Sequence, residues 1–443
     1  MRCNAFSALT AFAKSSCRFS LLFLALPLAA QTLAVAPIVA PLTATQVRQM
    51  PAQIRSALFI PERLPRLDAK VHGRFSPAPG VIAERVTYAS QFGLRIPAII
   101  YRPEKVHGRL PGIVLVNGHG ADKSSWYSWY TGILYARAGA VVLTYDPLGE
   151  GERNDEHKDG TGEHDTPAAE PTMPQRTGGA MVTDVMQGVS YLISRPDVAS
   201  NRIGVLGFSM GSFITAIAGA VDTRINAMLL VGGGDLDGPG GYWDTTHSVM
   251  CESGPYHALE FLGDRGATLF ALRARRGATF IVNGTADTVV AIPKNGPAFF
   301  ADLRQRTIAL NGSERNVFTT HFDEGASHRP ALVTPLAAAW LADQLHFAHW
   351  SSTQIAALPT VKIGDWAAKN NFILIGHTAW ENRDAGLIAV DIAAPILTPE
   401  QLSVLPLAEW QKQRAQFVYS SWSAATLADA SKGGAVLNMP GQN

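Results

Sequence analysis

The sequence predicts an α/β fold in which a mostly parallel central sheet carries helices on both faces. Short apolar segments alternate with segments of helical periodicity, as they do where strands and covering helices follow one another. Parallel strands that are covered on both faces are continuous apolar runs, and residues 112–116, 140–145 and 203–206 are runs of this kind. The length of 443 residues accommodates one large domain with an extension.

The composition indicates no nucleic-acid or anionic-membrane partner. The chain has 37 Lys and Arg residues against 36 Asp and Glu residues, and its formal net charge is +1. A nearly neutral chain exerts no broad electrostatic attraction on polyanions. Hydrophobic residues make up 47% of the chain, which is ordinary for a globular protein. We therefore expect no nucleic-acid partner, and the composition leaves the oligomeric state open.

Residues 1–30 are predicted to be a cleaved signal peptide. Basic residues precede an apolar run at residues 19–30, which ends in small residues. The run is short for a membrane span, which needs about 20 residues, although an N-terminal anchor is the alternative. Cleavage would remove Cys3 and Cys17 and leave Cys251 without a disulfide partner. We expect a secreted or periplasmic protein with no stable membrane anchor after cleavage.

Residues 31–80 are predicted to be a leader that wraps the surface of the fold. They are rich in Pro, Ala and Gln and include one short helix near residues 45–57. Residues 81–88 and 94–101 then alternate as strands do, with a turn between them, so we expect an antiparallel hairpin. Pro97 favours an edge position for the second of these strands.

Residues 81–350 are expected to form the α/β domain. Helices are expected at residues 183–194 and 212–221, and residues 150–176 and 232–277 are candidate loops or lids over a pocket. Buried strands are expected at residues 112–116, 140–145, 203–206, 227–231, 279–282 and 317–322. Chemistry in such a sheet gathers at the carboxyl ends of the strands.

Residues 351–443 lie beyond the alternating pattern. Strands are expected at residues 372–375 and 387–390, and a helix near residues 399–415. This segment is either a C-terminal extension that packs on the α/β domain or a small accessory domain, and the sequence leaves both open.

A serine between a strand and a helix is the candidate nucleophile. The pentapeptide Gly-Phe-Ser-Met-Gly at residues 207–211 places Ser209 after a buried strand and before a helix of small residues. This is the context of a nucleophile elbow, in which the serine occupies a strained turn and the glycines leave clearance for it. A hydroxyl needs an imidazole to accept its proton and a carboxylate to orient that imidazole. Ser209 is therefore predicted to be the nucleophile of a serine hydrolase.

In proteins with this elbow, the catalytic residues follow one another along the chain in the order Ser, acid, His, so we expect the acid and the base after Ser209. Asp287 follows the strand at residues 279–282, and His328 lies on a loop after the last strand. His321 is the competing base, but it falls inside that strand and would be held too rigidly. If Asp287 is not the acid, the reserve carboxylates are those after the fourth strand: Asp235, Asp237 and Glu252.

Two backbone amides are expected to form an oxyanion hole, as ester or amide cleavage requires. One is the amide of Met210, directly after the nucleophile, and the other is that of Ala121 or Gly120 in the loop after the first buried strand. His119 in the same loop could be a metal ligand or a second base. No His or carboxylate at ligand spacing accompanies it in the sequence, so we expect no metal site.

Aromatic and charged residues near this loop are candidates for substrate contact. Trp126 and Trp129, with two neighbouring tyrosines, could line a subsite for a sugar or aryl group, as could His119; the alternative is that the aromatic residues form the core of a helix. The sequence Asp-Pro-Leu-Gly-Glu-Gly-Glu-Arg at residues 146–153 is expected to fix a turn near the pocket. Its last two residues, Glu152 and Arg153, could bind substrate or form a surface ion pair.

These motifs together resemble those of bacterial α/β-hydrolases of the acetyl xylan esterase and dienelactone hydrolase-like groups. The resemblance covers residues 81–345 and implies an α/β-hydrolase fold. It also implies carboxylic-ester hydrolysis through an acyl-enzyme, with Ser209 as nucleophile, Asp287 as acid and His328 as base. No metal or organic cofactor is then needed, and the substrate is a small-molecule or carbohydrate ester, such as an acetyl ester.

Two other functions stay open. One is a serine peptidase of the prolyl-oligopeptidase-like type, although no propeller repeats precede the α/β region. The other is a non-catalytic binding protein with the same fold, against which the complete set of Ser, Asp and His argues.

Overall fold

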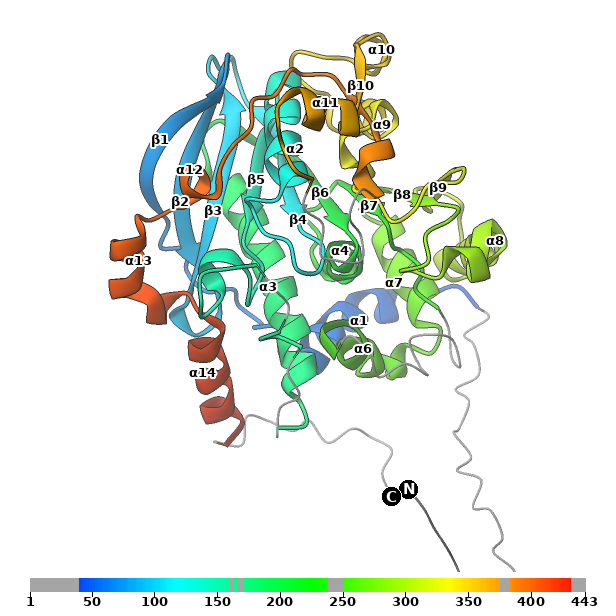
Figure 1. Cartoon of the computed structure of the whole chain (residues 1–443). Helices are drawn as coiled ribbons and strands as arrows, with labels where there is room; N and C mark the ends of the chain where they lie inside the picture. The colour runs from blue at the N-terminus through cyan, green and yellow to red at the C-terminus, as the bar shows by residue number, and fades with distance from the viewer. Residues whose placement is uncertain (1–39, 160–161, 166–169, 238–249, 375–382, 432–443) are drawn as a thin grey trace, which may run out of the picture. The chain divides into compact units, whose positions relative to one another are not determined.

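The fold is built on a nine-stranded sheet (Figure 1). The computed structural model describes residues 40–159, 162–165, 170–237, 250–374 and 383–431. The strands stand in the order β1-β2-β3-β5-β4-β6-β7-β8-β9. The first three pair antiparallel, β3 is antiparallel to β5, and all pairs from β5 to β9 are parallel. The structure confirms the mostly parallel α/β sheet that the sequence predicts.

Every strand of this sheet except β1 overlaps a predicted strand, although β6 begins five residues earlier than predicted. The strands are β1 (Lys70–Ala78), β2 (Val81–Ala89), β3 (Arg95–Pro103), β4 (Leu110–Val116), β5 (Val141–Tyr145), β6 (Val198–Phe208), β7 (Ala227–Val231), β8 (Ala278–Gly284) and β9 (Thr319–Asp323). The predicted hairpin is β2 and β3, and the predicted last strand β9 lies at the edge of the sheet.

Helices cover the sheet on both faces because successive residues of each buried strand point to opposite sides. In β4, Val114 and Val116 join the cluster that includes residues of α1, α3, α4 and α7, whereas Ile113 and Leu115 join the cluster that includes residues of α2, α9 and α11. The bounds of these helices are α1 (Ala44–Ala57), α2 (Trp126–Ala138), α3 (Met173–Ser194), α4 (Met210–Val221), α7 (Arg265–Ala274), α9 (Pro335–Leu345) and α11 (Ile363–Lys369). Two further helices are α6 (Met250–His257) and α8 (Ile292–Asn311).

The N-terminal part of the sheet differs from the prediction in two ways. The predicted leader contains β1 as well as the expected helix, now α1, so the sheet begins before residue 81. β3 is an interior strand between β2 and β5, so the edge position expected from Pro97 is wrong. Pro97 costs no ladder bond because the pairing with β5 begins at Ala98, and the Pro97 carbonyl accepts a hydrogen bond of 3.2 Å from the Asp146 amide.

Other local predictions need correction. The expected long loop at residues 232–277 contains α6 and α7, whose Gly and aromatic residues concealed the helical period, and α3 begins within the other candidate lid. No strand lies at residues 372–374. The predicted signal peptide and the remainder of that expected strand lie outside the described residues.

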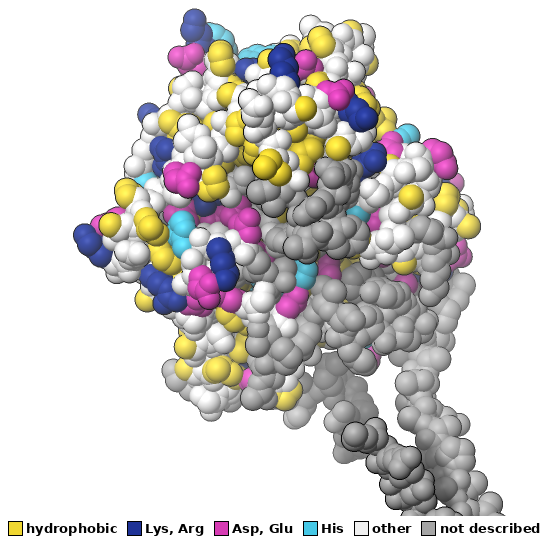
Figure 2. Space-filling view, viewed as in Figure 1, with side chains coloured by type: hydrophobic (Ala, Val, Ile, Leu, Met, Phe, Trp, Pro, Cys, Tyr) yellow, Lys and Arg dark blue, Asp and Glu magenta, His cyan; other side chains and the backbone are white. Residues whose placement is uncertain are grey.

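Among the described residues, no helix combines the length and apolar character that crossing a bilayer requires. On the face seen in Figure 2, basic and acidic side chains of the described residues are interspersed. The mixture is in keeping with the nearly equal numbers of basic and acidic residues in the chain.

The C-terminal segment packs on the α/β core. It contains α10 (Ser352–Ala356), β10 (Thr360–Lys362), β11 (Ile388–Val390), α12 (Pro399–Leu402), α13 (Leu407–Gln413) and α14 (Tyr419–Ser431) in addition to α11. Trp366 of α11 lies 6.2 Å and 5.8 Å, between ring centroids, from Trp126 and Trp129 of α2. The expected helix at residues 399–415 is divided into α12 and α13 by a non-helical stretch.

One buried carboxylate connects this segment to the core. The Glu152 side chain accepts hydrogen bonds from the amides of Val404 (2.9 Å) and Leu405 (3.2 Å). It also forms an ion pair of 2.7 Å with Lys123 Nζ, and both side chains are buried. The expectation that Glu152 lies on the surface or binds substrate is therefore wrong. The same holds for Arg153, which is fully buried and pairs with Asp184.

Replacing Glu152 should destabilise the fold by detaching the C-terminal segment. In Glu152→Ala the buried Lys123 ammonium loses one partner and two amides lose their acceptor, so we expect the free energy of unfolding to fall by about 3–5 kcal/mol. Urea denaturation followed by tryptophan fluorescence measures this change. The control is Glu409→Ala, which removes a partly exposed ion pair with Lys412 (3.6 Å) and should change stability by less than about 1 kcal/mol. Equal effects of the two substitutions would contradict this role.

Candidate active site

Ser209 occupies the turn between β6 and α4, as predicted. Its backbone has φ 55° and ψ −123°, a strained conformation for a residue other than glycine. Its amide donates a hydrogen bond of 2.9 Å to the Val231 carbonyl at the end of β7. A Cβ atom at Gly207 would lie 2.3 Å from the Gly211 carbonyl oxygen, and one at Gly211 would lie 2.2 Å from the Val116 carbonyl oxygen. The two glycines therefore supply the clearance that the sequence analysis expected of them.

The hydroxyl of Ser212 holds the turn in this conformation. Ser212 Oγ lies 2.9 Å from the Gly207 carbonyl oxygen and 2.8 Å from the Val231 carbonyl oxygen, and it accepts a hydrogen bond of 3.0 Å from the Val231 amide. It thus joins both ends of the turn to β7. Sequence reasoning missed this residue; the available signal is a serine that follows the candidate nucleophile by one helical turn within an apolar helix.

Asp287 and His328 lie in direct contact. The Nδ1 atom of His328 is 2.7 Å from Asp287 Oδ2, and both side chains are buried. Asp287 Oδ1 accepts hydrogen bonds from the amides of Val289 (3.0 Å) and Val290 (3.3 Å), which hold the carboxylate in place. With Nδ1 directed to the acid, Nε2 is the nitrogen that can take part in proton transfer.

The register of the sheet brings these two loops together. Gly284 at the end of β8 pairs with Asp323 at the end of β9, so the loops that carry Asp287 and His328 leave the sheet side by side. The His328 ring lies 4.9 Å, between centroids, from the ring of Phe208, the residue before Ser209. All three predicted residues therefore come from one edge of the sheet. The competitor His321 is half exposed on β9 and lies 2.9 Å from Asp323.

The two backbone amides predicted to bind the oxyanion differ in whether they already donate a hydrogen bond within the protein. Met210 is the first residue of α4, where a backbone amide has no intrahelical acceptor. The Ala121 amide donates a hydrogen bond of 3.1 Å to the Gly118 carbonyl, so it would have to give up this bond to hold an oxyanion. The Gly118 amide in turn donates to Tyr127 Oη at 3.0 Å, and the Tyr127 ring packs on Phe208. Tyr127 therefore positions this loop, a role that its place in an aromatic helix did not reveal.

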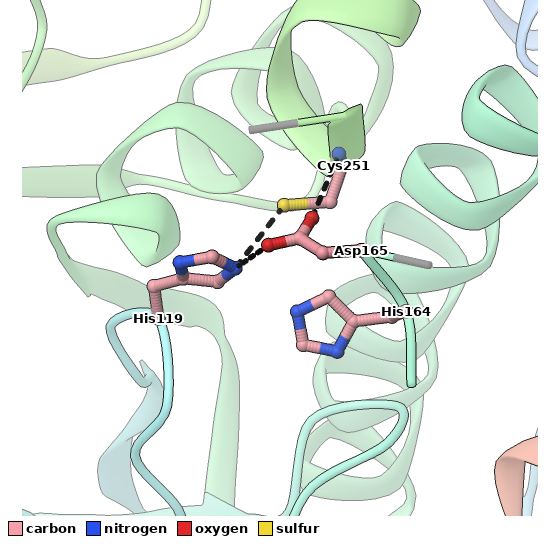
Figure 3. A group of neighbouring side chains, drawn as sticks. All are labelled: His119, His164, Asp165 and Cys251. Carbon is pink, nitrogen blue, oxygen red and sulfur yellow. Dashed lines mark hydrogen bonds and ion pairs between the residues drawn. The ribbon is translucent and has the colours of Figure 1, made fainter. Parts of the chain in front are cut away.

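His119 has partners that the sequence analysis did not expect. Its Nε2 atom lies 2.7 Å from Asp165 Oδ2 and 3.7 Å from Cys251 Sγ, and the His164 ring is 5.2 Å away between centroids (Figure 3). The expectation that no His or carboxylate accompanies His119 is wrong because these partners are remote in the sequence. The adjacent His-Asp pair at residues 164 and 165, within a predicted loop, was the available signal.

The pKa values of His119 and His164 are shifted in opposite directions. Burial disfavours the charged form of His119, but the hydrogen bond and charge of Asp165 outweigh burial and raise its pKa. Burial, followed by the charge of neighbouring His119, lowers the pKa of His164 to about 4.

Trp126 and Trp129 belong to the core, which is the alternative that the sequence analysis named. Trp129 is 0% exposed and Trp126 is 5% exposed. Trp126 Nε1 donates a hydrogen bond of 2.8 Å to Asp384 of the C-terminal segment. These two side chains therefore serve to anchor that segment, and they do not line a sugar or aryl subsite.

The region of the chain that carries the elbow matches a known family. Residues 65–231 match the family model described as acetyl xylan esterase. An uncharacterized protein of Pseudomonas aeruginosa is 29% identical over 146 residues, which are 33% of this chain and 35% of that protein. YtaP of Bacillus subtilis, named a putative hydrolase, is 28% identical over 142 residues, which are 30% of this chain and 46% of that protein. The matches thus span between a third and a half of the length of these relatives.

A solved structure shares the architecture over most of the chain. The methylesterase BT1017 superposes with a TM-score of 0.58 at 17% sequence identity, covering 88% of this chain and 76% of that one. At this identity the likeness shows a common fold. Together with the mostly parallel sheet, it confirms the predicted α/β-hydrolase fold. The family match confirms the resemblance to acetyl xylan esterases and agrees with the prediction of a carboxylic ester hydrolase.

Asp235, one of the reserve carboxylates, should make stability depend on pH. Burial is the main cause that raises its pKa to about 8, so the folded state holds a proton that the unfolded state loses near pH 4. The contribution of the protonated Asp235 carboxyl to the free energy of unfolding is fully present below about pH 4 and is lost as the pH rises to about 8. The Asn side chain does not titrate, so wild type should lose stability relative to Asp235→Asn by at most about 1.4 kcal/mol per pH unit across this window.

Urea denaturation of both proteins between pH 5 and pH 8 measures this difference. The control is Asp343→Asn, the same replacement at an exposed carboxylate of α9. A wild type that gains stability relative to Asp235→Asn as the pH rises would show that the carboxyl is ionised in the folded state.

Proposed function

We propose that this α/β-hydrolase-fold chain, whose residues 65–231 match the acetyl xylan esterase family, is a serine hydrolase that cleaves carboxylic esters through an acyl-enzyme. The single observation that carries the proposal is the hydrogen bond of 2.7 Å between Asp287 and His328, at the edge of the sheet where Ser209 occupies its strained turn. A buried carboxylate on Nδ1 fixes the tautomer and the orientation of an imidazole and stabilises its protonated form.

In the proposed reaction, Ser209 Oγ attacks the ester carbonyl while His328 Nε2 accepts the hydroxyl proton. The tetrahedral oxyanion is stabilised by the Met210 amide at the start of α4 and by an amide of the loop that contains Gly120 and Ala121. His328 then gives the proton to the departing alcohol. Water repeats the sequence on the acyl-enzyme and releases the acid. These steps use side chains and amides of the chain and require no metal or organic cofactor.

The substrate class that we propose is a carbohydrate or other small-molecule ester, with acetyl as the first acyl group to examine. The support is the family match, because nothing in the geometry selects the alcohol. We also propose that residues 1–30 direct export, since basic residues precede an apolar run at residues 19–30. The protein would then act outside the cytoplasm, without a stable membrane anchor.

Hydrolysis of an aryl acetate tests the reaction. Ser209→Ala and His328→Gln should each lower kcat/KM by about 10⁴-fold or more, because the nucleophile and its base act as one unit. Asp287→Asn should lower it by about 10³- to 10⁴-fold through loss of the correct imidazole tautomer. A parallel assay with the corresponding aryl amide distinguishes an esterase, for which the amide is a far poorer substrate, from a peptidase.

The matched control is His321→Gln, which removes a histidine that also pairs with an aspartate but lies half exposed on β9. Its kcat/KM should equal that of wild type. Wild-type rates in Ser209→Ala would overturn the proposed nucleophile, and wild-type rates in Asp287→Asn would transfer the role of the acid to a carboxylate after β7.

A further inference from the structure

Four potential metal ligands converge beside the elbow. His119 follows β4, His164 and Asp165 lie in the segment between β5 and α3, and Cys251 lies on α6 (Figure 3). One ligand atom from each residue lies within 4.8 Å of the other three. The Asp165 carboxylate also accepts a hydrogen bond of 3.4 Å from the Cys251 amide. Three segments that are distant in the sequence therefore present N, O and S donors to one point.

His164 is the member that an ordinary hydrogen-bonded cluster does not explain. Its side chain is 0% exposed, and its Nε2 atom has no hydrogen-bond partner in the part of the chain that the structure describes. Figure 3 shows one of its ring nitrogens facing Asp165 and His119. A buried polar atom without a partner destabilises the fold. The ion pair of His119 with Asp165 and the contact of the Cys251 thiol with His119 account for three members of the group but not for this nitrogen.

The other nitrogen of His164 has the surroundings of a metal-binding imidazole. Its Nδ1 atom also has no hydrogen-bond partner among the described residues, but it lies 3.9 Å from the buried Glu150 Oε1, so a small rotation of either side chain would give the outer nitrogen the carboxylate that usually supports a ligating histidine. The ring fits there because residue 149 is a glycine, where an added Cβ would lie 2.9 Å from Nδ1. The turn at residues 146–153 thus supplies both the space for this ring and a carboxylate behind it.

The donor set identifies the class of metal. One thiolate, two imidazoles and one carboxylate are ligands that Zn²⁺ takes in tetrahedral sites, with bonds of about 2.0–2.3 Å. Such bonds place ligand atoms about 3.5 Å apart. The four donors, all within 4.8 Å of one another, approach that spacing and need only side-chain adjustments to reach it. A thiolate and a carboxylate would also neutralise the charge of the ion.

We propose that His119, His164, Asp165 and Cys251 bind one Zn²⁺ as a closed structural site next to the nucleophile. Binding deprotonates the Cys251 thiol and releases that proton to solvent. Four protein ligands leave no open position for water or substrate, so the ion fixes the chain and takes no part in the chemical step. Cys251 Sγ lies 3.8 Å from Met210 Sδ, and His119 precedes Gly120 and Ala121, so the ion would hold the loop after β4 against α4.

Cobalt substitution tests the site without using activity. The full chain carrying Cys3→Ser and Cys17→Ser, so that Cys251 is its single thiol, is purified without a histidine tag, treated with chelator and titrated with Co²⁺. We expect one Co²⁺ per chain, the intense visible bands of tetrahedral cobalt, a thiolate-to-cobalt charge-transfer band, and displacement of all of these by one equivalent of Zn²⁺. Zn²⁺ should also raise the melting temperature of the metal-free protein.

Variants then assign the ligands. In the same background, Cys251→Ser should remove the charge-transfer band, and it and His164→Gln should each weaken Co²⁺ binding by at least about 10-fold. The control His321→Gln changes the half-exposed histidine of β9 and should bind as the parent does. Ser209→Ala should also bind Co²⁺ as the parent does. The metal-site proposal can therefore be refuted while the esterase proposal holds, and the esterase proposal can be refuted while the metal-site proposal holds. Absence of the charge-transfer band in the parent overturns the proposal whether or not the variants fold, and so does equal affinity of Cys251→Ser and the parent.

Discussion

The close approach of the loop after β6 to the strands on either side is the constraint on which the site depends. The Gly211 backbone lies against the Val116 carbonyl of β4, and the Ser209 amide donates to the Val231 carbonyl of β7. A side chain at residue 207 or 211 would separate these elements. Because the strained backbone of Ser209 is held from both sides, its hydroxyl lies at the carboxyl edge of the sheet, where the loops after β8 and β9 bring Asp287 and His328.

Buried ion pairs connect the loops at this edge of the sheet to parts of the chain that are distant from the reacting atoms. Lys123, in the segment after β4, pairs with Asp146 after β5 and with Glu152, and Glu152 in turn accepts the amides of Val404 and Leu405. The C-terminal segment is thereby joined by buried, charged hydrogen bonds to the loops that border the site. Such pairs are costly to break once buried, so the segment is part of the fold that presents the nucleophile.

Sequence patterns predicted what depends on local order and missed what depends on distant contacts. The buried strands, the elbow and the order Ser, Asp, His are local signals, and the structure brings Asp287 and His328 together. His119, Glu152 and Trp129 each have a partner more than 40 positions away, namely Asp165, Val404 and Trp366, and no periodicity encodes such contacts. The edge position expected from Pro97 failed because the ladder with β5 begins one residue later.

Covalent labelling tests the central claim, an activated serine at the turn after β6, most directly. A fluorophosphonate reacts with a serine hydroxyl whose proton an adjacent imidazole accepts, forming a phosphonyl ester and releasing fluoride. The account predicts one adduct per chain, located by mass spectrometry on the peptide that contains Ser209, and its loss in His328→Gln but not in His321→Gln. Labelling that falls on another residue, or that persists unchanged in His328→Gln, would contradict it.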